Sequence, residues 1–231
     1  MASCNKCNKS GDEVSLKHCA KCKQTNYCSR DCQKADWKAH KKICSQQAGS
    51  ASASASASGS GPGHQGLSPP SGLDEPIPDP FTRLDNGTYL HNRPEKDVYR
   101  LLLDTYRLRV DDMYTLEGDV DDDNIYAGRA DSLQGFGRFL RKITKSKKAL
   151  LPSWWTPEKQ QECEDFGMDE DQWQNLMSGV EKKDIIEHYQ DHQFPMQLRM
   201  LGEAIYGRAP GGSDGTSMRK MLAMFESGGA A

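Results

Sequence analysis

The chain has 231 residues and a formal net charge of −3, and no apolar run approaches the roughly 20 residues that a membrane-spanning helix needs. We therefore expect no membrane span. Seven of its 8 cysteines lie within the first 44 residues, and the remaining one is Cys163. The opening residues carry no apolar segment of the kind that directs secretion. We therefore expect reduced thiols in the nucleus or the cytoplasm rather than a disulfide framework.

The first 44 residues carry cysteines and one histidine at paired spacings, C-x2-C-x11-C-x2-C-x5-C-x3-C-x7-H-x3-C. A structural zinc ion takes four thiolate or imidazole ligands in a tetrahedron, so eight such residues predict two zinc ions. Because this count leaves no open position for water, we expect both ions to be structural rather than catalytic. The eight predicted ligands are Cys4, Cys7, Cys19, Cys22, Cys28, Cys32, His40 and Cys44.

Residues 29–44 have the composition of a helix, with Ser29 as a candidate N-cap and no Gly or Pro inside. In such a helix His40 and Cys44 lie four residues apart and share one face. The two C-x2-C pairs instead suit turns. A simple sequential scheme would place one ion on each half of the array, but spacing alone does not decide how the ligands pair. His18 falls outside the paired spacing, and we interpret it as an ordinary loop histidine.

The whole pattern, together with Tyr27, Gln33, Trp37 and the ending HKKIC, closely resembles the MYND-type zinc finger over residues 4–44. The resemblance implies an interleaved arrangement of the ligands. It assigns one zinc ion to Cys4, Cys7, Cys28 and Cys32, and the other to Cys19, Cys22, His40 and Cys44.

The resemblance also implies protein–protein interaction, through docking of short proline-containing peptides of the Pro-x-Leu-x-Pro kind. Gln33 and Trp37 are the candidate peptide-binding residues. They are four apart on the expected helix, where an indole beside an amide can bury a proline ring and hydrogen-bond its backbone. The alternative is that Trp37 packs beneath the zinc loops. A finger of this size cannot build a self-sufficient core, so we expect it to unfold without zinc.

Residues 46–80 differ in composition from the first 45 residues, since residues 48–62 are almost entirely Ala, Ser and Gly and several prolines come after them. Such a stretch cannot bury enough apolar surface to offset the entropy of ordering it. The sequence therefore predicts a disordered linker over residues 46–80. It would leave the finger, residues 1–45, able to move independently of the C-terminal part of the chain.

Residues 81–208 have the composition of a mostly helical domain, and residues 209–231 that of a flexible tail with room for a short helix. The clearest predicted helix covers residues 94–116, with Pro94 at its first position and apolar residues at helical spacing. Shorter helices are predicted over residues 131–144, 157–166, 171–177, 182–190 and 195–206. Gly135 and Gly137 weaken the first of these shorter predictions. The expected fold is thus a small two-zinc finger of short turns and a C-terminal helix, joined by a flexible linker to a mostly α-helical domain.

Residues 81–208 carry no sequence motif that identifies a function. They contain no P-loop, dinucleotide fingerprint, nucleophile elbow or SET methyltransferase motif, so we expect no enzyme activity, an unfamiliar active site aside. The first 45 residues carry ten Lys and Arg against four Asp and Glu, which gives the finger a basic surface. Nucleic-acid binding is nevertheless disfavoured, because no base-reading helix is evident.

The sequence therefore favours a zinc-dependent interaction adaptor whose partners are proteins with proline-containing motifs. One alternative is an accessory subunit of a ubiquitin ligase or methyltransferase complex. A second alternative is a weak nucleic-acid binder, whose affinity would depend steeply on salt concentration.

Overall fold

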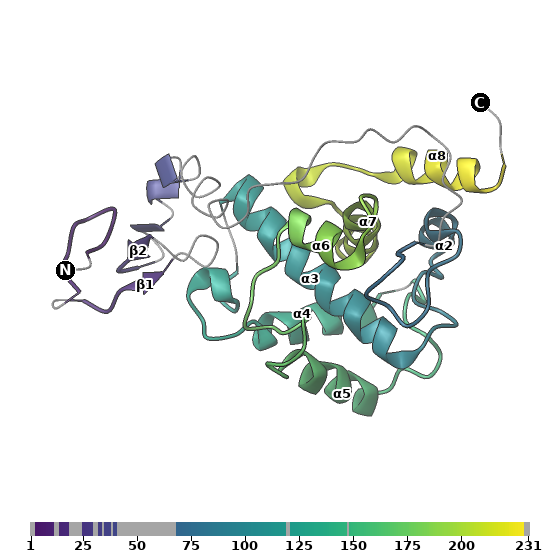
Figure 1. The fold of residues 1–231 in the computed structure, drawn as a ribbon, viewed down its shortest axis with the longest axis horizontal. Coiled ribbons are helices and arrows are strands. Elements are labelled where there is room, and N and C mark those ends of the chain that lie inside the picture. Colours follow the sequence, from purple (N-terminus) through teal and green to yellow (C-terminus); the bar gives the residue numbers. More distant parts are fainter. Residues whose placement is uncertain are drawn as a thin grey trace.

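A small N-terminal finger lies at one end of a larger helical domain (Figure 1). None of the described helices is long and apolar enough to cross a membrane. The predicted linker residues 46–67 lie outside the described part of the chain. The computed structural model describes residues 3–11, 14–18, 25–29, 32–33, 35–37, 39–40, 68–118, 121–146 and 148–228.

The finger contains two short antiparallel strands, β1 (Lys17–His18) and β2 (Asn26–Tyr27). The described residues between positions 32 and 40 are helical, as predicted. Ser29 begins this helix, because its Oγ accepts a hydrogen bond from the Cys32 amide at 3.2 Å. Its carbonyl oxygen accepts the first helical bond, from the Gln33 amide at 3.2 Å.

Helix α3 (Glu95–Glu117) runs through the helical domain, and its C-terminal end points toward the finger (Figure 1). It ends at Gly118, whose φ of +67° suits glycine. The prediction of this helix is confirmed. Around it pack α4 (Leu133–Thr144), α5 (Pro157–Gly167) and α7 (Phe194–Tyr206), and α6 (Lys182–Tyr189) packs on α7. Buried apolar side chains from these helices form one core, among them Leu101, Leu102, Leu108, Phe136, Phe139, Leu140, Ile185, Phe194 and Leu198.

Residues 171–177, predicted as a helix, form consecutive turns instead. The Asp169 carboxylate accepts a hydrogen bond from the Asp171 amide at 3.0 Å, which is a local alternative to the helical ladder. The fully buried Leu176 then donates its amide to the Gly167 carbonyl oxygen at 2.7 Å. The prediction was wrong because these bonds fold the segment back onto the end of α5.

The end of the predicted linker also differs from the expectation, since residues 68–79 pack on the helical domain. Ile77 is 2% exposed and belongs to the main core. The buried carboxylate of Asp97, on α3, accepts hydrogen bonds from the amides of Asp74 and Glu75 at 2.8 and 3.0 Å. The segment is therefore ordered by a polar anchor on α3, which its own composition does not reveal.

Two further helices close the end of the domain that lies away from the finger (Figure 1). The short helix α2 (Pro80–Asn86) was not predicted, whereas α8 (Thr216–Glu226) falls in the tail, where the sequence left room for a short helix. The Glu226 carboxylate caps α2, accepting hydrogen bonds from the amides of Phe81 and Thr82 at 2.9 and 2.7 Å. The end of the chain is thereby tied to α2.

Gly135 and Gly137 both lie inside α4, yet a Cβ atom would meet different neighbours at the two positions. At Gly135 it would overlap the Tyr106 hydroxyl and lie 3.0 Å from the Asp123 carbonyl oxygen, whereas at Gly137 its nearest neighbour, on the Arg141 side chain, is 3.4 Å away. Glycine inside a helix costs about 0.5–1 kcal/mol relative to alanine. We expect Gly137→Ala to raise the free energy of unfolding by about that amount and Gly135→Ala to lower it by about 1–3 kcal/mol, because overpacking strains the core. Urea unfolding of the two variants measures the contrast, and similar effects would contradict it.

Candidate metal centre and the adjoining finger surface

Four cysteine sulfur atoms of the finger gather within 4.8 Å of one another, those of Cys4, Cys7, Cys28 and Cys32. The sulfur atoms of Cys7 and Cys28 lie 3.4 Å apart, and those of Cys28 and Cys32 lie 3.6 Å apart. In a tetrahedral zinc–thiolate centre with bonds of about 2.3 Å, the sulfur atoms stand about 3.8 Å apart. The cluster therefore has the ligand chemistry and the dimensions of a zinc site.

This grouping distinguishes the sequential from the interleaved pairing scheme for the first ion. The sequential scheme joins the first C-x2-C pair to Cys19 and Cys22, whereas the structure joins it to Cys28 and Cys32, as the interleaved arrangement requires. Of the second predicted set, Cys19, Cys22 and Cys44 lie outside the described residues. His40 is described and 3% exposed, and its ring meets those of Tyr27 and Trp37 edge-on. The second zinc ion stays a prediction.

The local environment shifts the pKa values of two of these thiols, Cys4 and Cys28, in opposite directions. Burial by itself would raise the pKa of Cys4, but hydrogen bonds from the backbone of Cys7, Cys28 and Lys6 bring it down to about 6. At Cys28 the pKa rises to about 12, first because its sulfur shares a hydrogen bond with that of Cys7, then through burial and through Cys32. Thiolates this close repel one another, so a divalent cation is what allows all four to ionise together.

Asp36 supports the site and was missed by the sequence analysis. Its carboxylate is nearly buried and accepts hydrogen bonds from Asn5 Nδ2 at 2.7 Å and Tyr27 Oη at 2.8 Å. Asn5 lies in the turn between Cys4 and Cys7, so Asp36 ties that turn to the helix and to β2. A signal was available in the spacing, because Asp36 follows Cys32 by four residues and shares its helix face.

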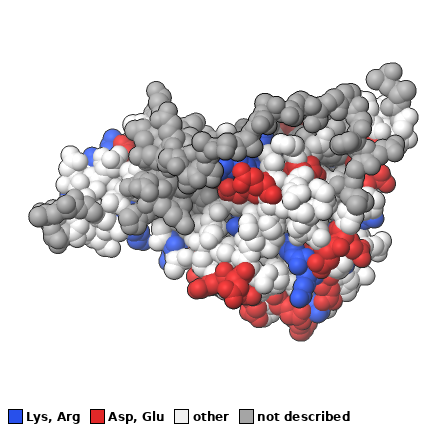
Figure 2. Space-filling view, in the orientation of Figure 1, with Lys and Arg blue, Asp and Glu red and all other residues white. Residues whose placement is uncertain are grey.

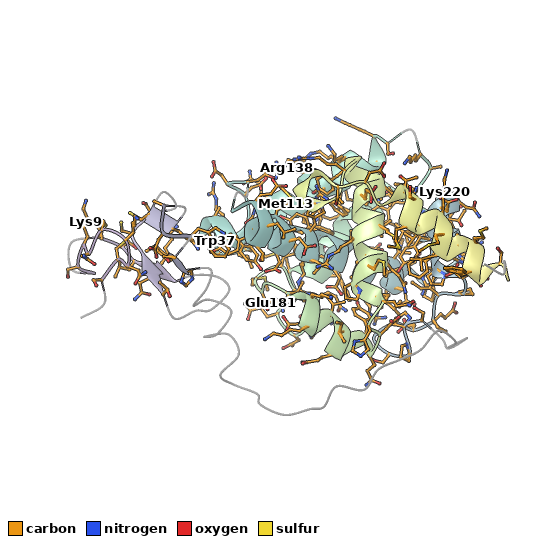
Figure 3. All side chains as sticks on the ribbon, turned by 90° about the horizontal axis from the view of Figure 1, so that it is seen from above. Lys9, Trp37, Met113, Arg138, Glu181 and Lys220 are labelled. Atoms are coloured by element: carbon orange, nitrogen blue, oxygen red, sulfur yellow. The ribbon has the colours of Figure 1, made fainter. Side chains whose placement is uncertain are left out.

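Gln33 and Trp37, the predicted peptide-binding residues, meet on a single side chain of the helical domain. The Trp37 ring lies 4.4 Å, centroid to centroid, from that of Tyr114 on α3. Gln33 Nε2 donates a hydrogen bond to Tyr114 Oη at 2.7 Å. Trp37 also approaches Gly118 so closely that a Cβ atom there would stand 2.9 Å from its Cδ1. Figure 3 shows Trp37 at the junction between the finger and the helical domain.

A second contact joins the basic finger to the helical domain. Lys17 Nζ, at β1, donates a hydrogen bond to the carbonyl oxygen of Gly128 at 2.9 Å. Gly128 follows the short 3-10 helix η1 (Ile125–Ala127) with a φ of +82°. On the face seen in Figure 2, basic side chains mark the edge of the finger, while acidic ones gather on the lower part of the helical domain. We call Lys17, Gln33 and Trp37, with their partners Tyr114, Gly118 and Gly128, the finger–domain contact.

Residues 4–44 match the family model of the MYND finger. SET domain-containing protein 14 of Caenorhabditis elegans is 51% identical over 41 residues, 18% of this chain and 9% of that protein. N-lysine methyltransferase SMYD2-B of Xenopus laevis is 54% identical over 35 residues, 15% of this chain and 8% of that protein. Zinc finger MYND domain-containing protein 10 homolog of Drosophila melanogaster is 61% identical over 28 residues, 12% of this chain and 6% of that protein.

The match to each of these relatives thus spans less than a tenth of the relative's length. No solved structure matches the chain.

Proposed function

We propose that this chain, whose residues 4–44 are a MYND-type zinc finger, is an interaction adaptor in which the finger binds proline-containing segments of partner proteins. The observation that supports this proposal is the convergence of Gln33 and Trp37 on Tyr114. Trp37 packs its indole on the Tyr114 ring, and Gln33 donates its side-chain amide to the Tyr114 oxygen. A proline ring and a neighbouring carbonyl group would form the same two interactions. The pair is therefore positioned for this chemistry.

The same arrangement implies that a partner competes with the helical domain. Trp37 is half-buried against Tyr114 and Gly118, so a proline segment that packs on the covered part of the indole would compete with these two residues. Among the described residues, the finger–domain contact includes the ring contact of Trp37 with Tyr114 and the hydrogen bonds donated by Gln33 and Lys17. The docked fraction of the protein lowers the apparent affinity for a partner, because only the undocked fraction binds.

The proposal includes a second zinc ion held by Cys19, Cys22, His40 and Cys44. His40 follows Asp36 by four residues, which continues the helix face that carries Cys32. With both zinc ions bound, the finger helix would supply Cys32 to one ion and His40 to the other. This arrangement would fix the relative positions of Gln33 and Trp37.

The relatives named as methyltransferases match this chain only within the finger. Their activity is therefore not carried over to residues 68–228. The role proposed for the chain is binding, with zinc as a structural component.

We expect Trp37→Ala to weaken binding of a Pro-x-Leu-x-Pro peptide at least about tenfold while the zinc content stays unchanged, because the indole supplies most of the apolar contact. Isothermal titration calorimetry on the zinc-loaded full chain measures this effect. Gln33→Ala should weaken binding less. Gln161→Ala removes an exposed glutamine of α5 and serves as the matched control. Unchanged affinity in Trp37→Ala would rule out the proposed binding face.

A further inference from the structure

A cavity of about 490 Å³ lies in the helical domain, where α3, α4 and the end of α7 meet. This volume falls within the range typical of small-molecule sites. Its walls combine cations, acids and two tyrosines, among them Tyr106, Arg109, Lys142, Tyr206, Asp121 and Asp122. The cavity lies outside the finger and takes no part in the proposed peptide binding.

One wall holds two cations around a tyrosine ring. Arg109 Cζ lies 3.9 Å and Lys142 Nζ 5.4 Å from the centroid of the Tyr206 ring. Arg109 is 7% exposed, and within the described residues its guanidinium makes one hydrogen bond, to the Arg208 carbonyl oxygen at 2.9 Å. Burial lowers its pKa, as expected for a charge that gives up water without gaining an ion-pair partner. A buried guanidinium in this state is strongly stabilised by an added anion.

Tyr106 forms part of the cavity wall without offering a polar group to it. The residue is 2% exposed and lines the cavity. Its hydroxyl oxygen is itself buried and faces Gly135 of α4, since it lies where a Cβ atom of residue 135 would stand. Tyr106 therefore shapes the cavity, while its hydroxyl is out of reach of a ligand.

Acidic groups line the cavity as well. Asp121 and Asp122 belong to the loop after α3, and Arg138 donates a hydrogen bond to Asp121 Oδ2 at 2.6 Å. Arg138 is thus paired with an acid, and Glu117 and Arg208 also line the cavity. Arg109 and Lys142 are the two cations beside the Tyr206 ring. A ligand that fits the cavity needs an anion at one end and hydrogen-bond donors at the other.

We propose that this cavity binds a small phosphorylated polyol, with its phosphate between Arg109 and Lys142 and its hydroxyl groups toward Asp121 and Asp122. A phosphate group offers the several acceptor oxygens that a guanidinium and an ammonium can share.

The cavity also adjoins the finger–domain contact. Val110 and Met113 line the cavity and pack in the same apolar cluster as Trp37. Figure 3 shows Met113 near both Trp37 and Arg138. A bound ligand therefore lies one layer of side chains away from the finger.

The test is calorimetric titration of the zinc-loaded full chain with ribose 5-phosphate, with ribose and succinate as comparison probes. We expect ribose 5-phosphate to bind, ribose not to bind, and Lys142→Gln to weaken binding about tenfold, because a charge-assisted contact is lost. Lys220→Gln, an exposed lysine on α8, should leave the affinity within about twofold of wild type. Figure 3 shows Lys220 well away from Arg138.

Tyr106→Phe serves as a second control, within the cavity wall itself. Its hydroxyl is buried against α4, so its removal should leave the affinity for ribose 5-phosphate within about twofold of wild type. Absence of ribose 5-phosphate binding would overturn the proposal, as would binding that Lys142→Gln leaves unchanged. Preference for succinate would also overturn it, by making the ligand a carboxylate.

Discussion

Cys28→Ser will lower the zinc content of the chain by at least one ion and unfold the finger, while the helical domain stays folded. Cys28 lies 3.4 Å from Cys7 and 3.6 Å from Cys32, sulfur to sulfur, so its loss leaves only three of the four thiolates. Structural zinc contributes about 10–16 kcal/mol to the folding of small fingers at neutral pH. A unit of this size has no core that could compensate. Native mass spectrometry counts the ions, and the main thermal transition of the helical domain should remain.

Cys163→Ala provides the matched control for this experiment. Cys163 is fully buried in α5, and burial raises the pKa of its thiol well above the ordinary value, so it is a neutral core group rather than a ligand. Its replacement should leave the zinc content as in the wild type. Equal zinc content in Cys28→Ser and wild type would show that the sulfur cluster is not a metal centre.

Asp97→Ala will lower the free energy of unfolding of the helical domain by about 3–5 kcal/mol, because it leaves a buried arginine without its charge partner. Asp97 is completely buried and accepts hydrogen bonds from Arg93 at 3.4 Å and Arg100 at 2.8 Å. It also accepts the amides of Asp74 and Glu75, which hold residues 68–79 against α3. Urea unfolding measures the loss of stability, and limited proteolysis should detect new cleavage within residues 68–79.

Asp85→Ala is the comparison for the Asp97 variant. Asp85 is an exposed residue of α2 that pairs with Arg219 at 3.1 Å, and surface pairs of this kind contribute about 1 kcal/mol or less. A loss of stability in Asp97→Ala no larger than in Asp85→Ala would contradict the anchoring role. Unchanged proteolysis of residues 68–79 would contradict it as well.

The elements that the sequence predicts well are those with local signals. Helix α3 has apolar residues at helical spacing and a proline at its start, and the structure places it within a residue of the prediction. The failures have non-local or competing causes. The Asp169 side chain redirects the segment after α5 into turns, and Asp97 orders a segment whose own composition predicts disorder. The helix α2 is only 7 residues long, too short for a periodic pattern to be visible.

The sites also differ in how far local sequence signals predict them. Cysteine spacing marks the candidate ligands because they lie in one short stretch of chain, whereas the grouping of Cys4, Cys7, Cys28 and Cys32 was implied by the family resemblance and not by the spacing. The partner of Gln33 and Trp37 was not predictable, since Tyr114 is more than 75 residues further along the chain. The cavity draws its side chains from α3, α4 and α7, and no sequence pattern indicates that Tyr106 and Lys142 share a wall.

In the function proposed for this chain, the finger uses one face alternately for Tyr114 and for a proline-containing partner. Calorimetric titration of a Pro-x-Leu-x-Pro peptide into zinc-loaded wild type and Tyr114→Ala tests this competition, with Tyr114→Phe as the variant that keeps the ring and loses the hydrogen bond from Gln33. Removal of the internal competitor should tighten binding several-fold in Tyr114→Ala and less in Tyr114→Phe. Equal or weaker binding in Tyr114→Ala would contradict the proposed competition, because Tyr114 would then not block the peptide.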